Sequence, residues 1–549
     1  MKWRVSVLNF IVIVIAVGVW MRLVYWQVFA SDELRQQAAN QRLWVVEIPG
    51  VRGEILASDG FPLVTNRPNY LLYANPKLAD SSDKWNNLAK LLPASDSATL
   101  DSKLSQKQLS WVKLSSEVSP QGKEMIEKLD LEGIGFDAQA IRFYPEGSSA
   151  AQLLGFVGQD AAGEAKGYFG LEGYYNRQLS AKSGKVVMER DALDRPIVIS
   201  GQNLFPAVDG SSIHTSIDRT LQFVLAEKLA RGIERYGAVA GTITIMDPFS
   251  GQVLAMVSLP NYDLTKYQQV DTGLFKNPVV ADAYEPGSTF KIVTMAAALD
   301  AGAVESEFKC NICSGPIQIG EYTIRTWNDK YYPNSTQTDI IVHSDNVGMV
   351  DVVRKLGKSR FLLYLHKFGF GVQTGVDLQD ESSPSLRSSE VWSEVDLATA
   401  AFGQGIAVTP IQMLRAAAVI ANGGLLVTPS VAKADLPAGR RVISWQSAAE
   451  MTAMMVKAVE KGEAKWAKPA GYAIAGKTGT AQIPVAGHYD SQKTIASFVG
   501  FAPVSHPKFA MLVTLREPKT SPWGSETAAP LWFDVAKELF RYYKIPPDK

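Results

Sequence analysis

The sequence is poor in the residues that crosslink small proteins or bind metals, with two cysteines and five histidines among 549 residues. Two cysteines cannot hold a fold of this size together, so apolar burial must stabilise it. The histidines are scattered and lack the H-E-x-x-H spacing of zinc hydrolases, so no metal and no cofactor is expected. An excess of either charge is also missing, since 55 basic residues balance 55 acidic ones. Nothing therefore indicates a nucleic acid partner.

Apolar material, in contrast, is plentiful: 46% of the residues are hydrophobic and 20% are charged, which excludes a mainly disordered chain. At roughly 100–200 residues per domain, the length predicts at least two domains. The pattern changes near Ser211, from irregular alternation to longer regular segments. We therefore expect an N-terminal stub and anchor at 1–30, a first domain at 31–210 and a second domain at 211–549.

One long hydrophobic run occurs, Val5–Met21, preceded by Lys2 and Arg4. A membrane-spanning helix needs about 17–25 such residues, so the run predicts a single-pass anchor. If the two basic residues stay in the cytoplasm, nearly all of the chain lies outside it. Basic residues on the far side leave this orientation open. Two alternatives are a signal peptide cleaved after Ala30 and a buried helix of a soluble protein.

The second domain shows strand and helix patterns in a mixed order. Strands early and late with helices between them predict one α+β domain whose sheet is completed by both ends of the segment. The expected helices are Asp218–Arg231 and Ala529–Tyr542, and the expected strands are Gly241–Met246, Gln252–Val257, Tyr472–Ala475, Ile495–Gly500 and Phe509–Thr514. In the first domain, Trp44–Ile48 and Lys185–Met188 are expected strands.

The first catalytic candidate is the segment Tyr284-Glu-Pro-Gly-Ser-Thr-Phe-Lys291. Its Pro-Gly turn places Ser288 at the start of an apolar helix, where free backbone N–H groups and the helix dipole favour a developing oxyanion. Lys291 follows on the same helix face, so the two side chains can meet. Desolvation lowers the pKa of a lysine in such a helix, and its neutral amine can then activate the serine.

Two further motifs are needed, because four other Ser-x-x-Lys pairs occur: Ser81–Lys84, Ser110–Lys113, Ser306–Lys309 and Ser505–Lys508. Ser344-Asp345-Asn346 lies between apolar segments and, taken alone, indicates a helix N-cap or an Asx-turn. Lys477-Thr478-Gly479-Thr480 follows a strand-like segment and, taken alone, indicates a hairpin turn. All three motifs occur together, in this order, in penicillin-binding proteins and serine β-lactamases.

The similarity extends along most of the chain, which resembles a class B penicillin-binding protein. Arg52-Gly-Glu-Ile55 is similar to the opening of the pedestal domain, Thr215–Gln222 resembles the entry to the catalytic domain, and Gly403-Gln-Gly405 matches a later stretch. The resemblance implies an α+β protein with a membrane-anchor helix, a β-rich, dimerisation-like pedestal at 31–210 and a transpeptidase domain at 211–549. That domain would have an antiparallel sheet flanked by helices, as in serine β-lactamases.

Details of the motifs bear on the subtype. Glu285-Pro-Gly and Ser344-x-Asn346-Val-Gly348 are more similar to the cell-division type than to the elongation type. Two positions depart from the family pattern: Asp345 stands where many relatives have serine, and Ala57-Ser58 stands where many have an Asp-Arg pair.

The resemblance also implies a mechanism. Ser288, deprotonated by Lys291, would attack the penultimate D-Ala carbonyl of a peptidoglycan stem peptide, and an amine of a second stem would resolve the acyl-enzyme into a crosslink. β-Lactams would trap the acyl form. The implied catalytic residues are Ser288, Lys291, Ser344, Asn346 and Lys477, and the implied substrate-binding residues are Thr478, Gly479 and Thr480. Expected partners are stem peptides, β-lactams, the bacterial cell membrane, a membrane glycan polymerase and other division proteins.

Two other functions share these motifs. A membrane-anchored β-lactamase would have the same serine and lysine, and Ser288-Thr-Phe-Lys291 is the form seen in class D enzymes, but those have valine in place of Asn346 and no pedestal. A penicillin-binding sensor or idle scaffold would not need the motifs intact. The pair Cys310 and Cys313 fits a disulfide or two packed thiols equally, and lacks the second pair of a zinc site.

Overall fold

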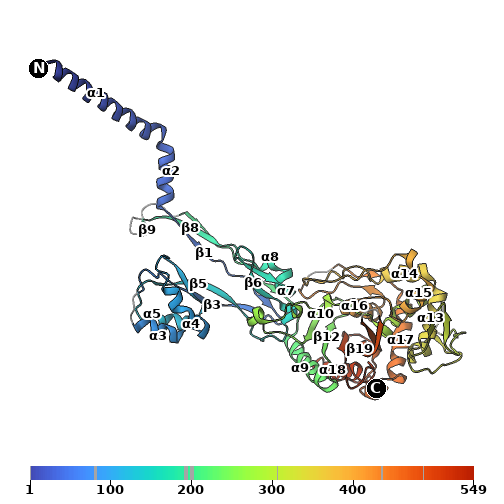
Figure 1. Ribbon diagram of the computed structural model, residues 1–549. Coiled ribbons are helices and arrows are strands. Elements are labelled where there is room, and N and C mark those ends of the chain that lie inside the picture. Colours follow the sequence, from blue (N-terminus) through green and yellow to red (C-terminus); the bar gives the residue numbers. More distant parts are fainter. Residues whose placement is uncertain are drawn as a thin grey trace.

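The computed structural model describes residues 2–79, 83–190, 196–197, 203–305, 307–433, 437–485 and 488–548. Three parts follow one another along the chain (Figure 1). A helix projects from one end, an elongated β-rich region lies in the middle, and a large domain of helices around a sheet lies at the other end. The expected α+β fold with an N-terminal apolar helix, a β-rich pedestal and a transpeptidase-like domain is confirmed.

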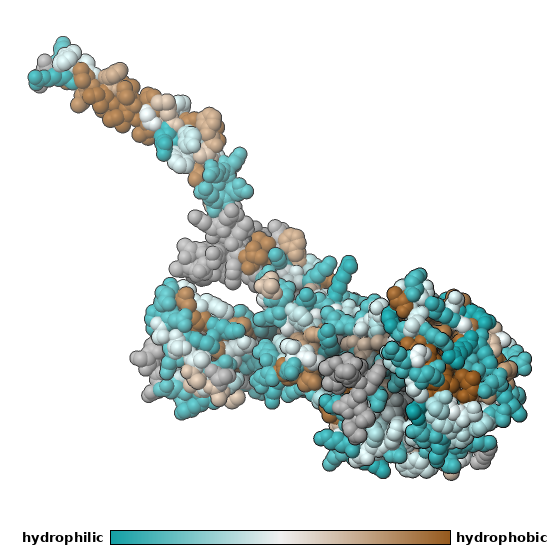
Figure 2. Space-filling model, turned by 45° about the vertical axis from the view of Figure 1, so that its right-hand side comes forward, coloured by the Kyte–Doolittle hydropathy of each residue, from teal (hydrophilic) through white to brown (hydrophobic). Residues whose placement is uncertain are grey.

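The projecting helix α1 (Lys2–Val24) continues through a π-helical turn to Phe29 and buries none of its residues. Figure 2 shows it as an apolar rod apart from the rest of the molecule. A helix that is apolar all round and packs against nothing requires a nonpolar solvent, so the buried-helix alternative is wrong. Its length and composition suit a membrane anchor. A signal sequence would pass the same test, and polar α2 (Ser31–Arg42) follows.

The middle region is built around β3, which pairs antiparallel with β4 and, from Thr65 to Ala74, with β5. Three helices, α3, α4 and α5, pack on this sheet through a core that includes Leu88, Leu100 and Ile126. Nearer the anchor, β1 pairs with β8, which confirms the two strands expected there.

The strands of this region are β1 (Leu43–Ile48), β2 (Ile55–Leu56), β3 (Pro62–Ala74), β4 (Val112–Val118), β5 (Ile134–Phe143), β6 (Phe156–Gln159), β7 (Ala165–Tyr168), β8 (Gly184–Arg190), β9 (Pro196–Ile197), β10 (Asn203–Phe205) and β11 (Ile213–His214). Its helices are α3 (Asp83–Leu91), α4 (Ala94–Leu104), α5 (Pro120–Glu127), α6 (Ala151–Leu154), α7 (Gly170–Tyr174) and α8 (Asn176–Leu179).

Three segments of this region, at Arg52, Arg142 and Glu172, meet at one buried carboxylate. Glu172 has a fully buried side chain and accepts hydrogen bonds from Arg52 Nε at 2.9 Å and from Arg142 Nε at 2.8 Å. Arg142 also reaches Asn66 Oδ1 at 3.0 Å. A buried carboxylate is tolerated when it is paired and hydrogen-bonded in this way. The ion cluster therefore ties together segments that are more than a hundred residues apart.

The C-terminal domain is organised by a five-stranded antiparallel sheet with the order β13-β12-β20-β19-β18. Helices α9 and α18 cover one face, and α11, α16 and α17 lie on the other. The strands are β12 (Ala240–Met246), β13 (Val253–Leu259), β14 (Ile317–Ile319), β15 (Tyr322–Ile324), β16 (Leu425–Leu426), β17 (Arg440–Arg441), β18 (Ala475–Val485), β19 (His488–Ala502) and β20 (Phe509–Arg516). The helices are α9 (Arg219–Tyr236), α10 (Pro278–Ala281), α11 (Lys291–Asp300), α12 (Gln337–Val342), α13 (Asn346–Leu356), α14 (Lys358–Lys367), α15 (Glu394–Ala400), α16 (Pro410–Ala421), α17 (Trp445–Lys461) and α18 (Ala528–Tyr542).

Strand β20 shows why this sheet has nearly continuous apolar strands. Phe509, Met511 and Val513 lie in the core under α9 and α18, whereas Ala510 and Leu512 lie in the core on the opposite face. A strand covered on both faces needs apolar residues at every position rather than at alternate ones. The edge strand β18 has a sheet neighbour on one side only, which leaves its other edge for the residues of the site.

One expected strand is wrong. Residues 472–474 precede β18, which begins at Ala475. The Tyr472 ring stacks on Phe540 of α18 with centroids 4.0 Å apart, and Ile474 is fully buried in the same core. The apolar residues of this segment therefore pack against α18. Their alternation in the sequence is the same as that of a strand, so the sequence could not distinguish the two.

The pedestal and the C-terminal domain share a continuous core. Phe156 of β6 stacks on Tyr267 with ring centroids 4.1 Å apart and contacts Phe275 at 4.9 Å. Strand β11 pairs with β2 in parallel, so the segment that enters the C-terminal domain is itself part of a pedestal sheet. Aromatic burial of this kind joins the two regions by packing as well as by a covalent connection.

Removal of the buried carboxylate tests the role of the ion cluster. Glu172→Gln leaves two arginines without their counter-charge, so we expect the free energy of unfolding of the pedestal to fall by about 3–5 kcal/mol. Scanning calorimetry of the full chain in detergent would measure it, with the exposed Glu164→Gln as the matched control. Equal stability of the two variants would contradict the assignment.

Candidate active site

Ser288 lies on a 3-10 turn, Gly287–Phe290, that leads directly into α11. Gly287 has a φ of +53°, and a Cβ there would lie 2.8 Å from the Thr480 carbonyl oxygen of β18. Only glycine allows the turn to approach the strand so closely. The Gly287 N–H donates to the Gly403 carbonyl at 3.0 Å, which fixes the turn from the other side. Ser288 itself is partly exposed at this junction.

Lys291, the first residue of α11, is fully buried. Its Nζ donates to the carbonyl oxygen of Ser344 at 2.5 Å, to Ser344 Oγ at 3.3 Å and to Asn346 Oδ1 at 2.8 Å. The spacing of the motif predicts a meeting with Ser288, but within the described chain Ser288 Oγ has no hydrogen-bond partner. Catalytic hydrogen bonds are often loose without a substrate, so this geometry does not remove Ser288 as a nucleophile.

Ser344 connects two helices and has an uncommon backbone conformation. Its φ is +56°, and it stands just after the C-cap of α12. The Ser344 N–H donates to the Ile341 carbonyl and the Asp345 N–H to the Ile340 carbonyl, the pattern of a Schellman motif. Glycine is usual at this position, because a left-handed backbone costs other residues roughly 1–2 kcal/mol. The motif turns the Ser344 side chain toward the lysines.

The middle residue of the triplet has a capping function. Asp345 is the N-cap of α13, and its Oδ1 accepts from Val347 N at 2.8 Å and from Gly348 N at 3.1 Å. The N-cap interpretation of Ser344-Asp345-Asn346 is therefore confirmed, and it coexists with the contacts of the flanking residues to Lys291. Asn346 also donates from Nδ2 to the Arg325 carbonyl at 3.0 Å, which fixes the orientation of its amide.

The second lysine comes from the edge strand. Lys477 of β18 is 3% exposed, and its Nζ contacts Ser344 Oγ at 3.0 Å and Thr478 Oγ1 at 3.2 Å. The segment 477–480 is part of a strand, so the hairpin-turn interpretation is wrong. A Cβ at Gly479 would lie 2.7 Å from Thr289 Cγ2, so glycine is required where the strand passes the serine turn. Thr480 Oγ1 accepts from Gly524 N at 2.9 Å.

Burial and mutual repulsion set the charge of the two lysines. Burial lowers the pKa of Lys291 well below its ordinary value of 10.5, and the nearby charge of Lys477 lowers it further. Burial lowers the pKa of Lys477 to about 8, against the opposing effect of the Glu463 carboxylate. Burial therefore disfavours the charged form of both lysines, and the charge of Lys477 disfavours the charged form of Lys291 further.

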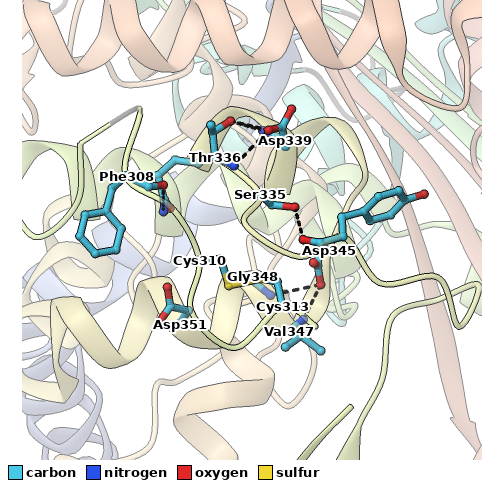
Figure 3. Close-up of a disulfide and its surroundings, with 12 residues drawn as sticks. Phe308, Cys310, Cys313, Ser335, Thr336, Asp339, Asp345, Val347, Gly348 and Asp351 are labelled. Carbon is cyan, nitrogen blue, oxygen red and sulfur yellow. Dashed lines mark hydrogen bonds between the residues drawn. A yellow bond between two sulfur atoms is a disulfide. The ribbon is translucent and has the colours of Figure 1, made fainter. Parts of the chain in front are cut away.

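The loop between α11 and α12 is closed by a disulfide. Cys310 and Cys313 are bonded, which settles the choice between a disulfide and packed thiols. Figure 3 shows the pair beside Val347 and Gly348, at the start of α13. The Cys310 N–H donates to the Ser335 carbonyl at 2.9 Å. The disulfide therefore stabilises the loop that packs on the helix whose N-terminal residue is Asn346.

The two other Ser-x-x-Lys pairs whose serines are described lie apart from this cluster. Ser110 precedes β4 and Ser505 lies in the turn between β19 and β20, and both are exposed. Ser81 and Ser306 lie outside the described residues. The geometry thus separates Ser288–Lys291 from the pairs at Ser110 and Ser505.

Sequence reasoning missed the residues that support the serine turn. The Gly403-Gln-Gly405 segment was matched by resemblance only, without a role. Its Gly403 carbonyl accepts from Gly287 N at 3.0 Å, and Gly405 N donates to Glu285 Oε1 at 3.0 Å. Glu463, which faces the lysines, carries no motif at all. Only the three-dimensional arrangement identifies these residues.

Comparisons with known proteins agree with this geometry. Residues 241–540 match the family described as penicillin binding protein transpeptidase domain, and residues 47–215 match the penicillin-binding protein dimerisation domain. The chain is 32% identical to stage V sporulation protein D of Bacillus subtilis, over 96% of this chain and 84% of that protein. It is 30% identical to the probable peptidoglycan D,D-transpeptidase PenA of Neisseria meningitidis serogroup A, over 100% of this chain and 94% of that protein. The crystal structure of penicillin binding protein 2X from Streptococcus thermophilus superposes with a TM-score of 0.75 at 25% identity, over 91% of this chain and 80% of that one.

The backbone of Ser344 gives a prediction for stability. Ser344→Gly and Ser344→Ala both remove the hydroxyl, but only alanine keeps a Cβ in the left-handed conformation. We expect the glycine variant to be the more stable by about 1 kcal/mol in thermal or denaturant unfolding. An alanine variant at least as stable as the glycine variant would show that Ser344 is not held in this conformation.

Proposed function

This chain belongs to the class B penicillin-binding proteins, and on that premise we propose that it is a peptidoglycan D,D-transpeptidase acting through an acyl-enzyme on Ser288. One observation carries the proposal. The Ser344 hydroxyl contacts the amines of both Lys291 and Lys477, at 3.3 and 3.0 Å, beside the serine turn and the edge strand. A nucleophile, a base, a proton relay and a cation are thereby available in one cluster.

In the proposed acylation step, neutral Lys291 takes the Ser288 proton and the serine Oγ attacks the carbonyl carbon of the penultimate D-Ala. The backbone N–H groups of Ser288 and Thr480 stabilise the oxyanion that forms. The amide C–N bond then breaks, and Ser344 passes a proton from the lysines to the departing nitrogen. The terminal D-Ala leaves as the free amino acid.

In the second step, an amine of a neighbouring stem peptide attacks the acyl-enzyme carbonyl. The Ser288 ester bond breaks, a new amide bond forms, and the proton of the attacking amine returns to the Ser288 oxygen through Lys291. The same groups serve both steps with reversed direction of proton transfer. The product is a crosslink between two glycan strands.

The edge of β18 is the proposed substrate platform. An extended peptide can add to an edge strand through its backbone groups. Thr478 and Thr480 hydroxyls, with the charge of Lys477, would bind the terminal carboxylate, and Asn346 would bind the substrate amide. The absence of a side chain at Gly479 would let the peptide backbone lie close to the strand.

The setting of this reaction is part of the proposal. The apolar helix α1 supports a single-pass anchor in the bacterial cell membrane, with the catalytic domain outside the cytoplasm. Glu285-Pro-Gly and Ser344-x-Asn346-Val-Gly348 support a role in septal rather than lateral wall synthesis. A membrane glycan polymerase and other division proteins are the proposed partners. β-Lactams are the proposed inhibitors, since they would acylate Ser288.

The nucleophile is tested by covalent capture. The full chain in detergent should form a long-lived adduct with fluorescent penicillin, and Ser288→Ala should form none. Ser505→Ala, which alters a pair of the same spacing outside the cluster, should label like the unsubstituted protein. An adduct on the Ser288→Ala variant would refute the assignment, and rapid turnover of penicillin would favour the β-lactamase alternative.

The two lysines predict a bell-shaped pH profile. Acylation requires neutral Lys291, so its rate should rise with pH and level off well below 10.5, because burial lowers the pKa of Lys291. It also requires charged Lys477, so the rate should fall again as pH passes about 8. Stopped-flow measurement of the second-order rate of penicillin acylation tests both limbs. A rate that only begins to rise near pH 10 would contradict the assignment of Lys291 as the base.

A further inference from the structure

A small cavity lies behind the catalytic strand. Its volume is about 10 Å³, and it lies among residues of α12, α17, β18 and β19. Its lining includes apolar residues, Thr478 and two charged residues, Glu463 and Lys477. A cavity of this volume has room for about one water molecule and excludes any part of a peptide. Glu463 and Lys477 therefore share a space that is too small for substrate.

Glu463 follows the C-terminus of α17 and is half-buried. Its Oε1 atom is buried and has no hydrogen-bond partner among the described residues. A carboxylate taken out of water without partners destabilises a fold unless nearby positive charge compensates for it. The charged groups near Glu463 therefore determine whether its unpartnered oxygen is compensated.

The charged groups facing Glu463 come from four elements. Lys477 of β18, Lys291 of α11 and His343 after α12 favour its charged form, and Glu526, ahead of α18, opposes it. Burial nevertheless raises the pKa of the Glu463 carboxyl above its ordinary value. Asp345, at the N-terminus of α13, adds a second negative charge near Lys291. The site thus combines two lysines with two carboxylates: Glu463 shares the cavity with Lys477, and Asp345 lies near Lys291.

We propose that Glu463 is a positioning residue for acylation: its carboxylate, across the cavity from Lys477, keeps that lysine charged and so makes Lys291 the lysine that gives up its proton. This inference rests on the roles of the two lysines in the proposed function. It adds the reason why two lysines that contact the same hydroxyl act differently, one as a cation and one as a base.

The asymmetry follows from the contacts. Glu463 and Lys477 line one cavity, whereas Lys291 does not line it, so the carboxylate acts more strongly on Lys477. Charged Lys477 then disfavours a second charge on Lys291, because both amines contact Ser344 Oγ. Removal of the Glu463 charge would lower the pKa of Lys477. It would also lower the pKa of Lys291, but by less.

The test compares pH profiles of acylation for Glu463→Gln and the unsubstituted full chain, using fluorescent penicillin. Glutamine keeps the shape and removes the charge, so the alkaline limb should move to lower pH by about one unit. The acid limb, set by Lys291, should move in the same direction by less. Glu463→Asp should restore most of the original profile. Glu460→Gln, an exposed neighbour on α17, should leave the profile unchanged.

A thermal unfolding measurement separates this role from packing. A loss of packing alone would lower the unfolding temperature of Glu463→Gln and its acylation rate at every pH, whereas a loss of the charge moves the limbs of the pH profile. A profile that does not shift, or a rate that falls equally at every pH, would overturn the inference while leaving the proposed function intact. Failure of the unsubstituted chain to become acylated would overturn the proposed function and this inference with it.

Discussion

The shared contact of two buried lysines with one hydroxyl is the constraint on which the rest of this site depends. Lys291 and Lys477 lie within about 6 Å of each other, since their amines contact Ser344 Oγ at 3.3 and 3.0 Å. At an effective dielectric constant of about 20, two unit charges at that separation repel by about 3 kcal/mol. That energy corresponds to about two pKa units, enough to make one amine neutral while the other is charged. The packing therefore disfavours a charge on both amines at once, which is the basis of the different roles proposed for the two lysines.

The fold brings Lys291, Ser344 and Lys477 together from distant parts of the chain. Lys291 comes from the first turn of α11, Ser344 from the junction of α12 and α13, and Lys477 from an edge strand. The sheet is buried on both faces, so β18 cannot shift relative to α11 without opening two cores. A core shared with the pedestal extends this rigidity toward the anchor, and Figure 1 shows the pedestal between the projecting helix and the catalytic domain.

Hydrophobic patterning predicted the elements whose burial is simple. It predicted the apolar N-terminal helix, the strands β12, β13 and β20, and the closing helix α18. Each of these elements has a hydrophobic run or periodicity that matches its surroundings. The segment 472–474 was mistaken for a strand because packing against Phe540 requires the same residue types. The meeting of residues 291, 344 and 477 could not be derived from spacing, because contacts between distant segments leave no local pattern. It came from the resemblance. The left-handed Ser344 and the unmarked Glu463 carry no signal in a single sequence, since each departs from what its local position favours.

The most direct test of the account is an NMR titration of the lysine side chains in full chain labelled with ¹⁵N-lysine, with Lys291→Arg and Lys477→Arg variants to assign the two Nζ signals. The account predicts that near neutral pH the Lys291 signal is that of a neutral amine while the Lys477 signal is that of an ammonium, which loses its proton at about pH 8. Two signals that remain charged together and titrate near the ordinary value of 10.5 would contradict it.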